Sequence, residues 1–209
     1  MTRRALDLFC KAGGAAFGYH LAGFEVVGVD IEPQPDFPFT FVLADALTFP
    51  LDGFDLIHAS PICKGYSACS VLNDAQHPKQ IEAVRGRLAS SGIPYVIENV
   101  EGAPLRDPVT LCGAMFPGLR TYRHRLFEAS FAIPQLPEPV HAWPLAKMGR
   151  PPRAGEWIQV VGHFPDVAAA RAAMQIPWMT RDQLAQAIPP PFTRHVGRAA
   201  IEAHRRAGS

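Results

Sequence analysis

The feature that most constrains the fold is an alternation between short apolar runs and segments with helical spacing. Each run is short and bounded by turn-forming or acidic residues, which is typical of a buried strand. Strands that alternate with helices are joined by right-handed crossovers in a parallel sheet. We therefore predict an α/β fold with a doubly wound, mostly parallel sheet. The predicted strands are 5–9, 25–31, 39–47, 54–59, 94–100 and 124–131, and the helices between them are 13–24 and 77–92.

The amino-acid composition of the chain changes after residue 131. Six prolines between residues 132 and 155 predict a loop-like insertion. Regular structure is expected to resume over 156–209, which would return to the main body of the fold. At 209 residues, the chain is long enough to form one domain, 1–209, with a substantial core. The predicted closing elements are a strand at 156–164 and helices at 166–176, 180–188 and 193–206.

Charge and cysteine content narrow the possible classes only slightly. The net charge of +1 argues neither for nor against nucleic acid, although basic residues cluster at 120–125, 147–153 and 193–206. The four cysteines form no C-x-x-C pair, so we predict free thiols, no disulfide framework and no metal. No apolar stretch approaches the roughly 20 residues that span a bilayer. We expect a cytoplasmic monomer that makes no membrane contact.

The ends of the predicted strands carry a candidate cofactor site. Ligands of an open parallel sheet bind beyond the carboxyl ends of the strands. Gly13 and Gly14 follow the first strand, where they allow a tight turn and expose helical N–H groups. Asp30 ends the second strand and suits two ribose hydroxyls, while Asp45, at the end of the third, suits an adenine amino group. The combination predicts an adenosine-type cofactor, and the missing G-x-G-x-x-G pattern disfavours a dinucleotide.

Five short motifs follow one another along the chain, and their order is more specific than any one of them. They are "DLFCKAGG" at 7–14, "SPICKGYS" at 60–67, "YVIENV" at 95–100, "YRHRLFE" at 122–128 and "HVGRAA" at 195–200. In this order they resemble the cofactor motif, Pro-Pro-Cys-Gln loop, Glu-Asn-Val motif, Gln-x-Arg-x-Arg strand and late Gly-Asn helix of the C5-cytosine DNA methyltransferases. Short phage-type members are the most similar. The resemblance implies the fold of S-adenosyl-methionine-dependent methyltransferases, which is Rossmann-like.

The resemblance implies a covalent mechanism. Cytosine C5 is a poor nucleophile, so a thiolate must first attack C6, and this role falls to Cys63. Glu98 would then hold a proton against cytosine N3, with Asn99 supporting the loop. Arg123 and Arg125, expected on alternate positions of one strand, would clamp cytosine O2, the nucleophile loop and Glu98. S-adenosyl-methionine would supply the methyl group, and water would accept the C5 proton.

The resemblance also implies two sets of binding residues. The predicted S-adenosyl-methionine-binding residues are Phe9, Lys11, Gly13, Gly14, Asp30, Ile31, Asp45, Ala46 and Pro61. The predicted substrate-binding residues are Ser60, Lys64, Tyr66, Ser67, Asn99, Arg194 and Arg198. The expected partner is DNA with its target cytosine flipped out of the helix, or a cytidine nucleotide.

Several positions depart from the family pattern. Ile62 and Lys64 replace the second proline and the glutamine of the nucleophile loop, and Thr121 replaces the glutamine of the arginine strand. Arg198 stands where the late motif has asparagine. Two extra cations support the hypothesis that Lys64 and Arg198 together select a cofactor that carries an additional negative charge.

The insertion at 132–155 is much shorter than the recognition region of the family's sequence-specific members. A short segment can supply few major-groove contacts, each worth roughly 1–3 kcal/mol of discrimination. We therefore predict a specificity that is short or lax, such as a dinucleotide.

Two other functions stay open. A small insertion also suits an enzyme that modifies free cytidine nucleotides, and the altered nucleophile loop suits a catalytically silent protein that binds DNA or the cofactor. Among the remaining residues, we predict that His58 is a hydrogen-bonded core histidine and that Cys112 is an inert thiol. Trp143, Trp157 and Trp178 are predicted to serve in packing.

Overall fold

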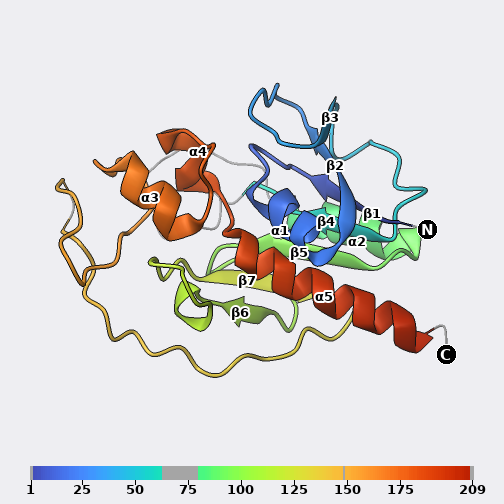
Figure 1. The fold of residues 1–209 in the computed structure, drawn as a ribbon. Helices are drawn as coiled ribbons and strands as arrows, with labels where there is room; N and C mark the ends of the chain where they lie inside the picture. The colour runs from blue at the N-terminus through green and yellow to red at the C-terminus, as the bar shows by residue number, and fades with distance from the viewer. Residues whose placement is uncertain (1, 63–79, 148, 208–209) are drawn as a thin grey trace.

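One seven-stranded sheet organises the computed structural model, which describes residues 2–62, 80–147 and 149–207 (Figure 1). The strand order is β3-β2-β1-β4-β5-β7-β6. The first five of these strands are parallel, whereas β7 runs antiparallel to both β5 and β6. The predicted doubly wound, mostly parallel sheet is thus confirmed. The strands are β1 (Arg3–Leu8), β2 (Phe24–Asp30), β3 (Thr40–Leu43), β4 (Leu56–Ala59), β5 (Tyr95–Asn99), β6 (Val109–Leu111) and β7 (Arg125–Ala129).

The order of the sheet reverses between β1 and β4. β1 pairs with β2 on one side and with β4 on the other, so the chain crosses over β1 after completing β3. The connections that leave β1 and β4 therefore depart in opposite directions, which opens a crevice beyond their carboxyl ends. This topology places the binding site of the fold next to the ends of β1 and β4.

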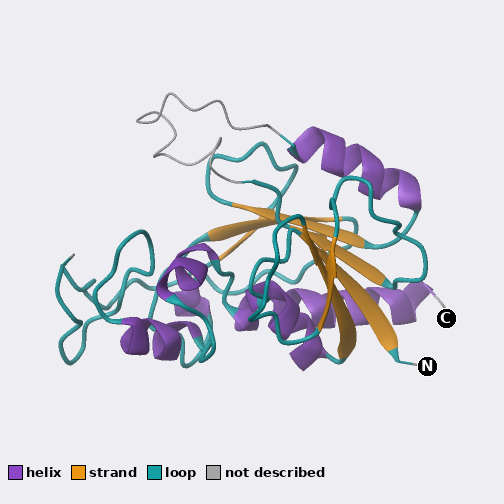
Figure 2. Cartoon of the chain, turned by 90° about the horizontal axis from the view of Figure 1, so that it is seen from above, coloured by secondary structure: helices purple, strands orange, loops and turns teal. Residues whose placement is uncertain are grey.

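Helices cover both faces of the sheet (Figure 2). On one face, α1 and α5 contribute Tyr19 and Phe192 to a core that also contains Phe127 of β7. On the other face, α2 contributes Val84 and Leu88 to a second core. Burial on both faces explains why the central strands are apolar runs rather than alternating ones. The helices are α1 (Gly14–Ala22), α2 (Ile81–Ser91), α3 (Val167–Met174), α4 (Arg181–Gln186) and α5 (Pro190–Ala207).

Close packing between α1 and α5 depends on two glycines. A Cβ atom at Gly18 would lie 2.0 Å from Oγ1 of Thr193, and one at Gly197 would lie 2.9 Å from Cβ of Ala22. The Thr193 hydroxyl also donates to the Ala15 carbonyl oxygen at 2.9 Å. The last helix is thereby joined to the first helix, 178 residues earlier in the chain.

A third apolar cluster joins α3 and α4 to the loop that follows β1. It contains Met174 of α3, Leu184 of α4, Ile158 and Ala12. Trp178 adds a hydrogen bond from its indole N–H to the Ala12 carbonyl oxygen at 3.0 Å. Trp178 therefore packs against the fold, as predicted. Among the described helices, none is both long and apolar enough to cross a membrane.

The predicted strand at 156–164 is wrong. The only β-type pairing found there, among the described residues, is an isolated bridge between Leu145 and Trp157. Ile158 donates its N–H to the Arg120 carbonyl oxygen, so the backbone of this segment bonds to loops instead of to a ladder. Ile158 and Val160 are buried in the third cluster, which accounts for the apolar pattern.

Element boundaries differ elsewhere for local reasons. β3 ends at Leu43, because Asp45 begins a turn in which its carbonyl oxygen accepts the N–H groups of Thr48 and Phe49. β6 was not predicted, since three residues carry too little pattern. α5 begins at Pro190, earlier than expected, and proline is favoured in a first helical turn.

Candidate active site

Glu98 lies at the carboxyl end of β5 and is 5% exposed. One of its carboxylate oxygens, Oε1, is 3.0 Å from Nε of Arg125, the first residue of the neighbouring β7. Burial raises the pKa of the Glu98 carboxyl, and the nearby Arg125, the Ser60 hydroxyl and Arg123 partly offset that rise. Glu98 can therefore keep a proton at a higher pH than an exposed glutamate.

A chain of side-chain hydrogen bonds connects Glu98 to the core. The Tyr19 hydroxyl lies 2.9 Å from Nδ1 of His58, whose Nε2 lies 2.8 Å from the Ser60 hydroxyl. Burial lowers the pKa of His58 to about 3, so its imidazole is neutral near pH 7. A neutral imidazole has one donor and one acceptor. If Ser60 donates to Glu98, His58 must donate from Nε2 and accept from Tyr19 at Nδ1. The prediction that His58 is a hydrogen-bonded core histidine is confirmed.

Asn99 fastens the start of the predicted nucleophile loop to β5. Its side-chain amide donates to the Pro61 carbonyl oxygen at 2.9 Å, and Asn99 is buried. Pro61 and Ser60 follow β4, so the end of β4 and the end of β5 are held together at the switch point of the sheet. The predicted nucleophile Cys63 and the predicted substrate residues Lys64, Tyr66 and Ser67 lie outside the described residues.

Arg123 does not share a strand with Arg125, and that prediction is wrong. β7 begins at Arg125, and Arg123 precedes it in a loop with a φ of 33°. Its guanidinium donates to the carbonyl oxygens of Val160, Ala185 and Ala187. Because all three acceptors lie in the closing part of the chain, Arg123 holds that part against the sheet, and its charge still lowers the pKa of Glu98.

The loop after β1 has the sharp turn that was predicted. Gly13 adopts a φ of 85°, which disfavours any side chain there. A Cβ at Gly13 would lie 2.8 Å from Cδ of Pro38, and one at Gly14 would lie 2.6 Å from the Ile188 carbonyl oxygen. The two glycines are thus required by the fold itself, in addition to any cofactor.

Asp30 ends β2 beside this loop and is 3% exposed. Its carboxylate accepts the backbone N–H groups of Lys11 and Glu32, both at 3.1 Å. The Lys11 ammonium lies 3.7 Å from Asp30 and 2.9 Å from Glu32. Lys11 and Asp30, both predicted to bind the cofactor, are therefore in contact at the edge of the sheet where the carboxyl ends of β1 and β2 meet.

The other predicted cofactor residues surround the same edge. Asp45 is exposed, and one of its carboxylate oxygens accepts the Leu47 N–H at 2.8 Å. Part of its hydrogen-bonding capacity is therefore used within the turn. Ile31 is 71% exposed, whereas Ala46 is buried in the second core. Phe9 has a φ of 60°, which is a strained conformation for an aromatic residue. Strain of this kind often accompanies a binding site.

Asp7 belongs to this site although sequence reasoning did not include it. It lies inside β1 and is 1% exposed, and neither carboxylate oxygen has a well-formed hydrogen bond within the described residues, although the Ala16 N–H lies close enough to lower its pKa. Burial holds its pKa well above the ordinary range, and the charges of Asp30 and Glu98 add to the effect, although the Ala16 N–H partly offsets it. The available signal was an acid inside the apolar run "ALDLF". A buried carboxyl of this kind suits a cationic group of a ligand.

Arg194 and Arg198 are not brought to this site. Both are exposed on α5, and the adjacent Gly197 packs against Ala22 at the last residue of α1. α1 begins at the carboxyl end of β1 and runs back across the sheet, so Arg198 lies toward the opposite edge. The hypothesis that Arg198 and Lys64 act together on an anionic cofactor therefore gains no support from the fold.

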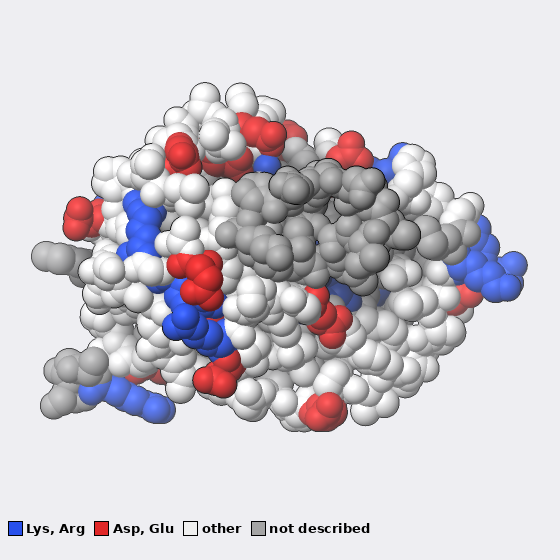
Figure 3. Space-filling model, turned by 180° about the vertical axis from the view of Figure 1, so that it is seen from behind, with Lys and Arg blue, Asp and Glu red and all other residues white. Residues whose placement is uncertain are grey.

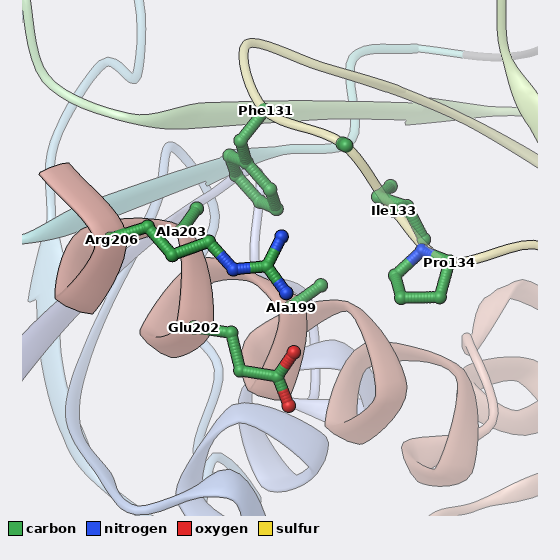
Figure 4. Close-up of a pocket in the computed structure, with 8 residues that line it drawn as sticks. Phe131, Ile133, Pro134, Ala199, Glu202, Ala203 and Arg206 are labelled. Carbon is green, nitrogen blue, oxygen red and sulfur yellow. The ribbon is translucent and has the colours of Figure 1, made fainter.

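A hollow of about 500 Å³ lies between α5 and the segment after β7 (Figure 4). Phe131 and Ile133 face Ala199, with Glu202 and Arg206 on the helix side. Because β7 is antiparallel to β5, this segment lies at the amino end of β5, opposite Glu98. The hollow is separate from the strand-end site.

Acidic and basic side chains are interspersed on one face of the molecule, where the described residues form no continuous basic surface (Figure 3). In the predicted basic cluster at 147–153, Arg150 contacts both carboxylate oxygens of Glu156, at 2.6 and 2.7 Å. This arginine is therefore engaged within the protein.

The fold is shared with known methyltransferases. A protein of an E. coli prophage, assigned as a DNA modification methyltransferase, superposes with a TM-score of 0.71 over 98% of this chain and 100% of that one, at 14% identity. A variant of Spodoptera frugiperda DNMT2 gives a TM-score of 0.46 at 15% identity, over 79% of this chain and 61% of that one. No protein-family model matches the sequence, and comparison with curated proteins gives no significant match.

The likeness to the prophage protein defines the class of the fold. The chain has the Rossmann-like fold of S-adenosyl-methionine-dependent methyltransferases, with the antiparallel β7 inserted between β5 and β6. The nearly complete mutual coverage with the prophage protein also means that the two chains have nearly the same extent.

Proposed function

We propose that the protein is a DNA cytosine-5 methyltransferase that uses S-adenosyl-methionine and forms a covalent intermediate through Cys63. The observation that carries the proposal is the environment of Glu98. This buried carboxyl has a raised pKa, contacts Arg125 at 3.0 Å and stands next to Asn99, which anchors the loop leading to Cys63. A carboxyl that keeps a proton to higher pH than usual, next to the loop that leads to Cys63, suits attack on a cytosine ring.

The residues around β1 and β2 fit the proposed cofactor. Asp7 offers a buried carboxyl with no well-formed hydrogen bond inside the described part of the protein, which suits the ammonium group of the cofactor's methionine part. Asp30 lies at the end of β2, where its carboxylate suits the ribose hydroxyls. It also accepts the Lys11 N–H and so orders the loop beside the proposed cofactor. When bound, S-adenosyl-methionine supplies the methyl group.

In the proposed mechanism, the Cys63 thiolate forms a bond to C6 of cytosine. Electrons move toward N3, where Glu98 holds a proton and Arg125 keeps the carboxyl in place. C5 is then nucleophilic and acquires the methyl group. Loss of the C5 proton to water and departure of Cys63 from C6 restore the aromatic ring and the free thiolate. Each bond made to the protein is broken again, so the enzyme turns over.

Trapping the intermediate tests this proposal. In DNA that contains 5-fluorocytosine, C5 carries no proton to lose, so the Cys63–C6 bond should persist and appear as a covalent protein–DNA adduct. We expect the adduct with the wild-type protein and none with Cys63→Ser. Cys69→Ser, which changes a cysteine of the same segment, should retain it. A catalytically silent protein would bind the cofactor and give no adduct.

A free-nucleotide substrate is the second candidate. It is favoured by the engagement of Arg150 with Glu156, which leaves this arginine less available to a DNA backbone, and by the interspersed charges on the one face that Figure 3 draws. Transfer of labelled methyl to dCMP, single-stranded DNA and duplex DNA separates the two functions. The proposal requires DNA to be methylated far faster than dCMP at equal cytosine concentration.

A further inference from the structure

Three potential metal ligands meet at the edge of the sheet near β6 and β7, outside the proposed catalytic site. Cys112 directly follows β6, His124 directly precedes β7, and His141 belongs to the Pro-rich segment 132–155. One ligand atom from each residue lies within 4.8 Å of the others. Cys112 Sγ and His141 Nε2 are 3.2 Å apart. Residues from three separate parts of the chain thus converge on one point.

The distances and donor types suit zinc. Zn²⁺ binds sulfur at about 2.3 Å and imidazole nitrogen at about 2.0–2.1 Å in a tetrahedral arrangement, which separates two such ligands by roughly 3.6 Å. The distance of 3.2 Å between Cys112 and His141 is close to that separation. One thiolate with two imidazoles is a donor set typical of zinc, whereas magnesium and calcium prefer oxygen.

Neighbouring groups orient these side chains as the outer shell of a metal site does. A backbone N–H of η2 (Gly113–Met115) donates to the Cys112 sulfur and holds it in place. The Tyr122 ring lies against His141, with centroids 4.0 Å apart. The Glu101 carboxylate lies 4.0 Å from Nδ1 of His124.

A simple thiol–imidazole hydrogen bond explains only part of this arrangement. It accounts for the contact between Cys112 and His141, and Glu101 lies near His124. Neither contact explains why both imidazole rings, with centroids 5.1 Å apart, converge on the Cys112 sulfur. A metal ion accounts for all three residues. His141 is exposed and His124 is partly exposed, so an ion could enter from solvent.

We propose that Cys112, His124 and His141 bind one Zn²⁺ ion, which fastens the Pro-rich segment to the edge of the sheet. The described residues of the segment form no helix and only one isolated bridge. Its other contacts with the body of the protein include those of the Tyr122 hydroxyl with the Trp143 backbone and of His195 with the Pro134 carbonyl oxygen. The ion would also fix the start of β7, where Arg125 contacts Glu98. This proposal replaces the expectation of no metal, which rested on local cysteine spacing.

Cobalt substitution tests the site in the full-length protein. After removal of metal with a chelator, Co²⁺ should bind with one equivalent per chain and give a thiolate-to-cobalt charge-transfer band in the near ultraviolet. The band should be absent from Cys112→Ser and unchanged in Cys63→Ser. His141→Ala, at an exposed position, should fold normally and bind Zn²⁺ at least tenfold more weakly in competition with a chromophoric chelator. His204→Ala, an exposed histidine of α5, is the matched control.

A thermal measurement gives a second readout. Zn²⁺ should raise the melting temperature of the wild-type and His204→Ala proteins, because a ligand that binds only the folded state stabilises it. It should have little effect on His141→Ala. The proposal is overturned if the wild-type protein takes up no Co²⁺, if the band survives in Cys112→Ser, or if His141→Ala and His204→Ala bind zinc equally.

Discussion

Asp7 combines almost complete burial with the lack of a well-formed hydrogen bond from the described residues, the Ala16 N–H being the nearby donor. Its cross-strand neighbours are Gly28 of β2, which has no side chain, and His58 of β4, which is itself fully engaged by Tyr19 and Ser60. An acid in this position opposes folding when it is ionised, so its presence implies a benefit that folding alone does not explain. Binding of a cationic ligand group provides that benefit.

Replacement of Asp7 by Asn should therefore stabilise the ligand-free protein near neutral pH, by on the order of 1–3 kcal/mol. The pKa of Asp7 is higher in the folded state than the ordinary value of 3.8, so the folded state binds the proton more tightly. Stability then falls as the pH rises from 3.8 through the raised pKa. Urea unfolding across this range should give a flatter curve for Asp7→Asn than for wild type.

The control for this change is Asp52→Asn, at an exposed position, which should leave the pH dependence of the wild type intact. The same pair tests the cofactor role. S-adenosyl-methionine should raise the melting temperature of Asp52→Asn as much as that of the wild type, and that of Asp7→Asn much less. Equal shifts in all three proteins would contradict the role assigned to Asp7.

We propose that Ser60 positions Glu98, in addition to the substrate contact predicted from the sequence. Its hydroxyl lies 2.8 Å from His58 and lowers the pKa of Glu98. Ser60→Ala should raise that pKa further, so the protonated form would persist to a higher pH. The limb of the rate profile that reports Glu98 should shift upward in pH, together with a loss of about tenfold to 100-fold in kcat.

Ser130→Ala is the matched control for Ser60, because Ser130 bonds to the backbone of Tyr95 at the other end of β5. It should leave the pH profile unchanged. A uniform loss of rate in Ser60→Ala, without a shift in the profile, would mean that Ser60 has only a structural role.

At the scale of elements, the contact between α1 and α5 should be sensitive to added volume. Gly18→Ala places a methyl group 2.0 Å from the Thr193 hydroxyl and 2.2 Å from the Pro190 carbonyl oxygen, where backbone must move. We expect a loss of about 1–3 kcal/mol or more of unfolding free energy, as is usual for overpacking. Chemical denaturation followed by circular dichroism measures it.

Gly86→Ala offers an opposite control within α2. A Cβ at Gly86 meets nothing within 4 Å, so alanine should stabilise the protein by about 1 kcal/mol through its higher helix propensity. If both substitutions change stability in the same direction, the packing interpretation of the α1–α5 contact is wrong.

At the scale of the whole molecule, the Pro-rich segment limits how long a DNA sequence the proposed enzyme can recognise. The described part of this segment forms neither a helix nor a strand, and Arg150 is paired with Glu156. Few side chains remain for base edges. Bisulfite sequencing of a methylated random-sequence duplex should show a requirement at one or two base pairs and tolerance elsewhere. A fixed site of four or more base pairs would contradict this prediction.

The strands of the sheet show how much of the fold the local apolar pattern predicts. Strands 5–9, 25–31, 54–59 and 94–100 were predicted within two residues of β1, β2, β4 and β5, since a buried parallel strand is apolar throughout. The segment 156–164 has the same apolar pattern, yet it packs as an irregular segment in the third cluster. An apolar pattern indicates that a segment is buried, but it does not indicate whether a neighbouring strand is available to pair with its backbone.

The candidate site likewise contains residues that the sequence predicted correctly and one that it misplaced. Asp30, Glu98 and Asn99 were predicted because each stands at the end of a recognisable strand, and parallel strands necessarily bring those ends together. Arg123 was misplaced because it was expected on the same strand as Arg125, whereas β7 begins only at Arg125. Its actual partners, the carbonyl oxygens of Val160, Ala185 and Ala187, lie at least 37 residues away.

The sequence by itself determined the parallel sheet and the row of polar residues at its edge, because periodicity and strand ends are properties of neighbouring residues. Only the tertiary structure decided that Asp7 is a buried acid without a well-formed hydrogen bond from the described residues, and that His58 and Ser60 lead to Glu98. It also brought Cys112 to two histidines. These outcomes depend on desolvation and on contacts between distant segments, and no local pattern encodes either of them.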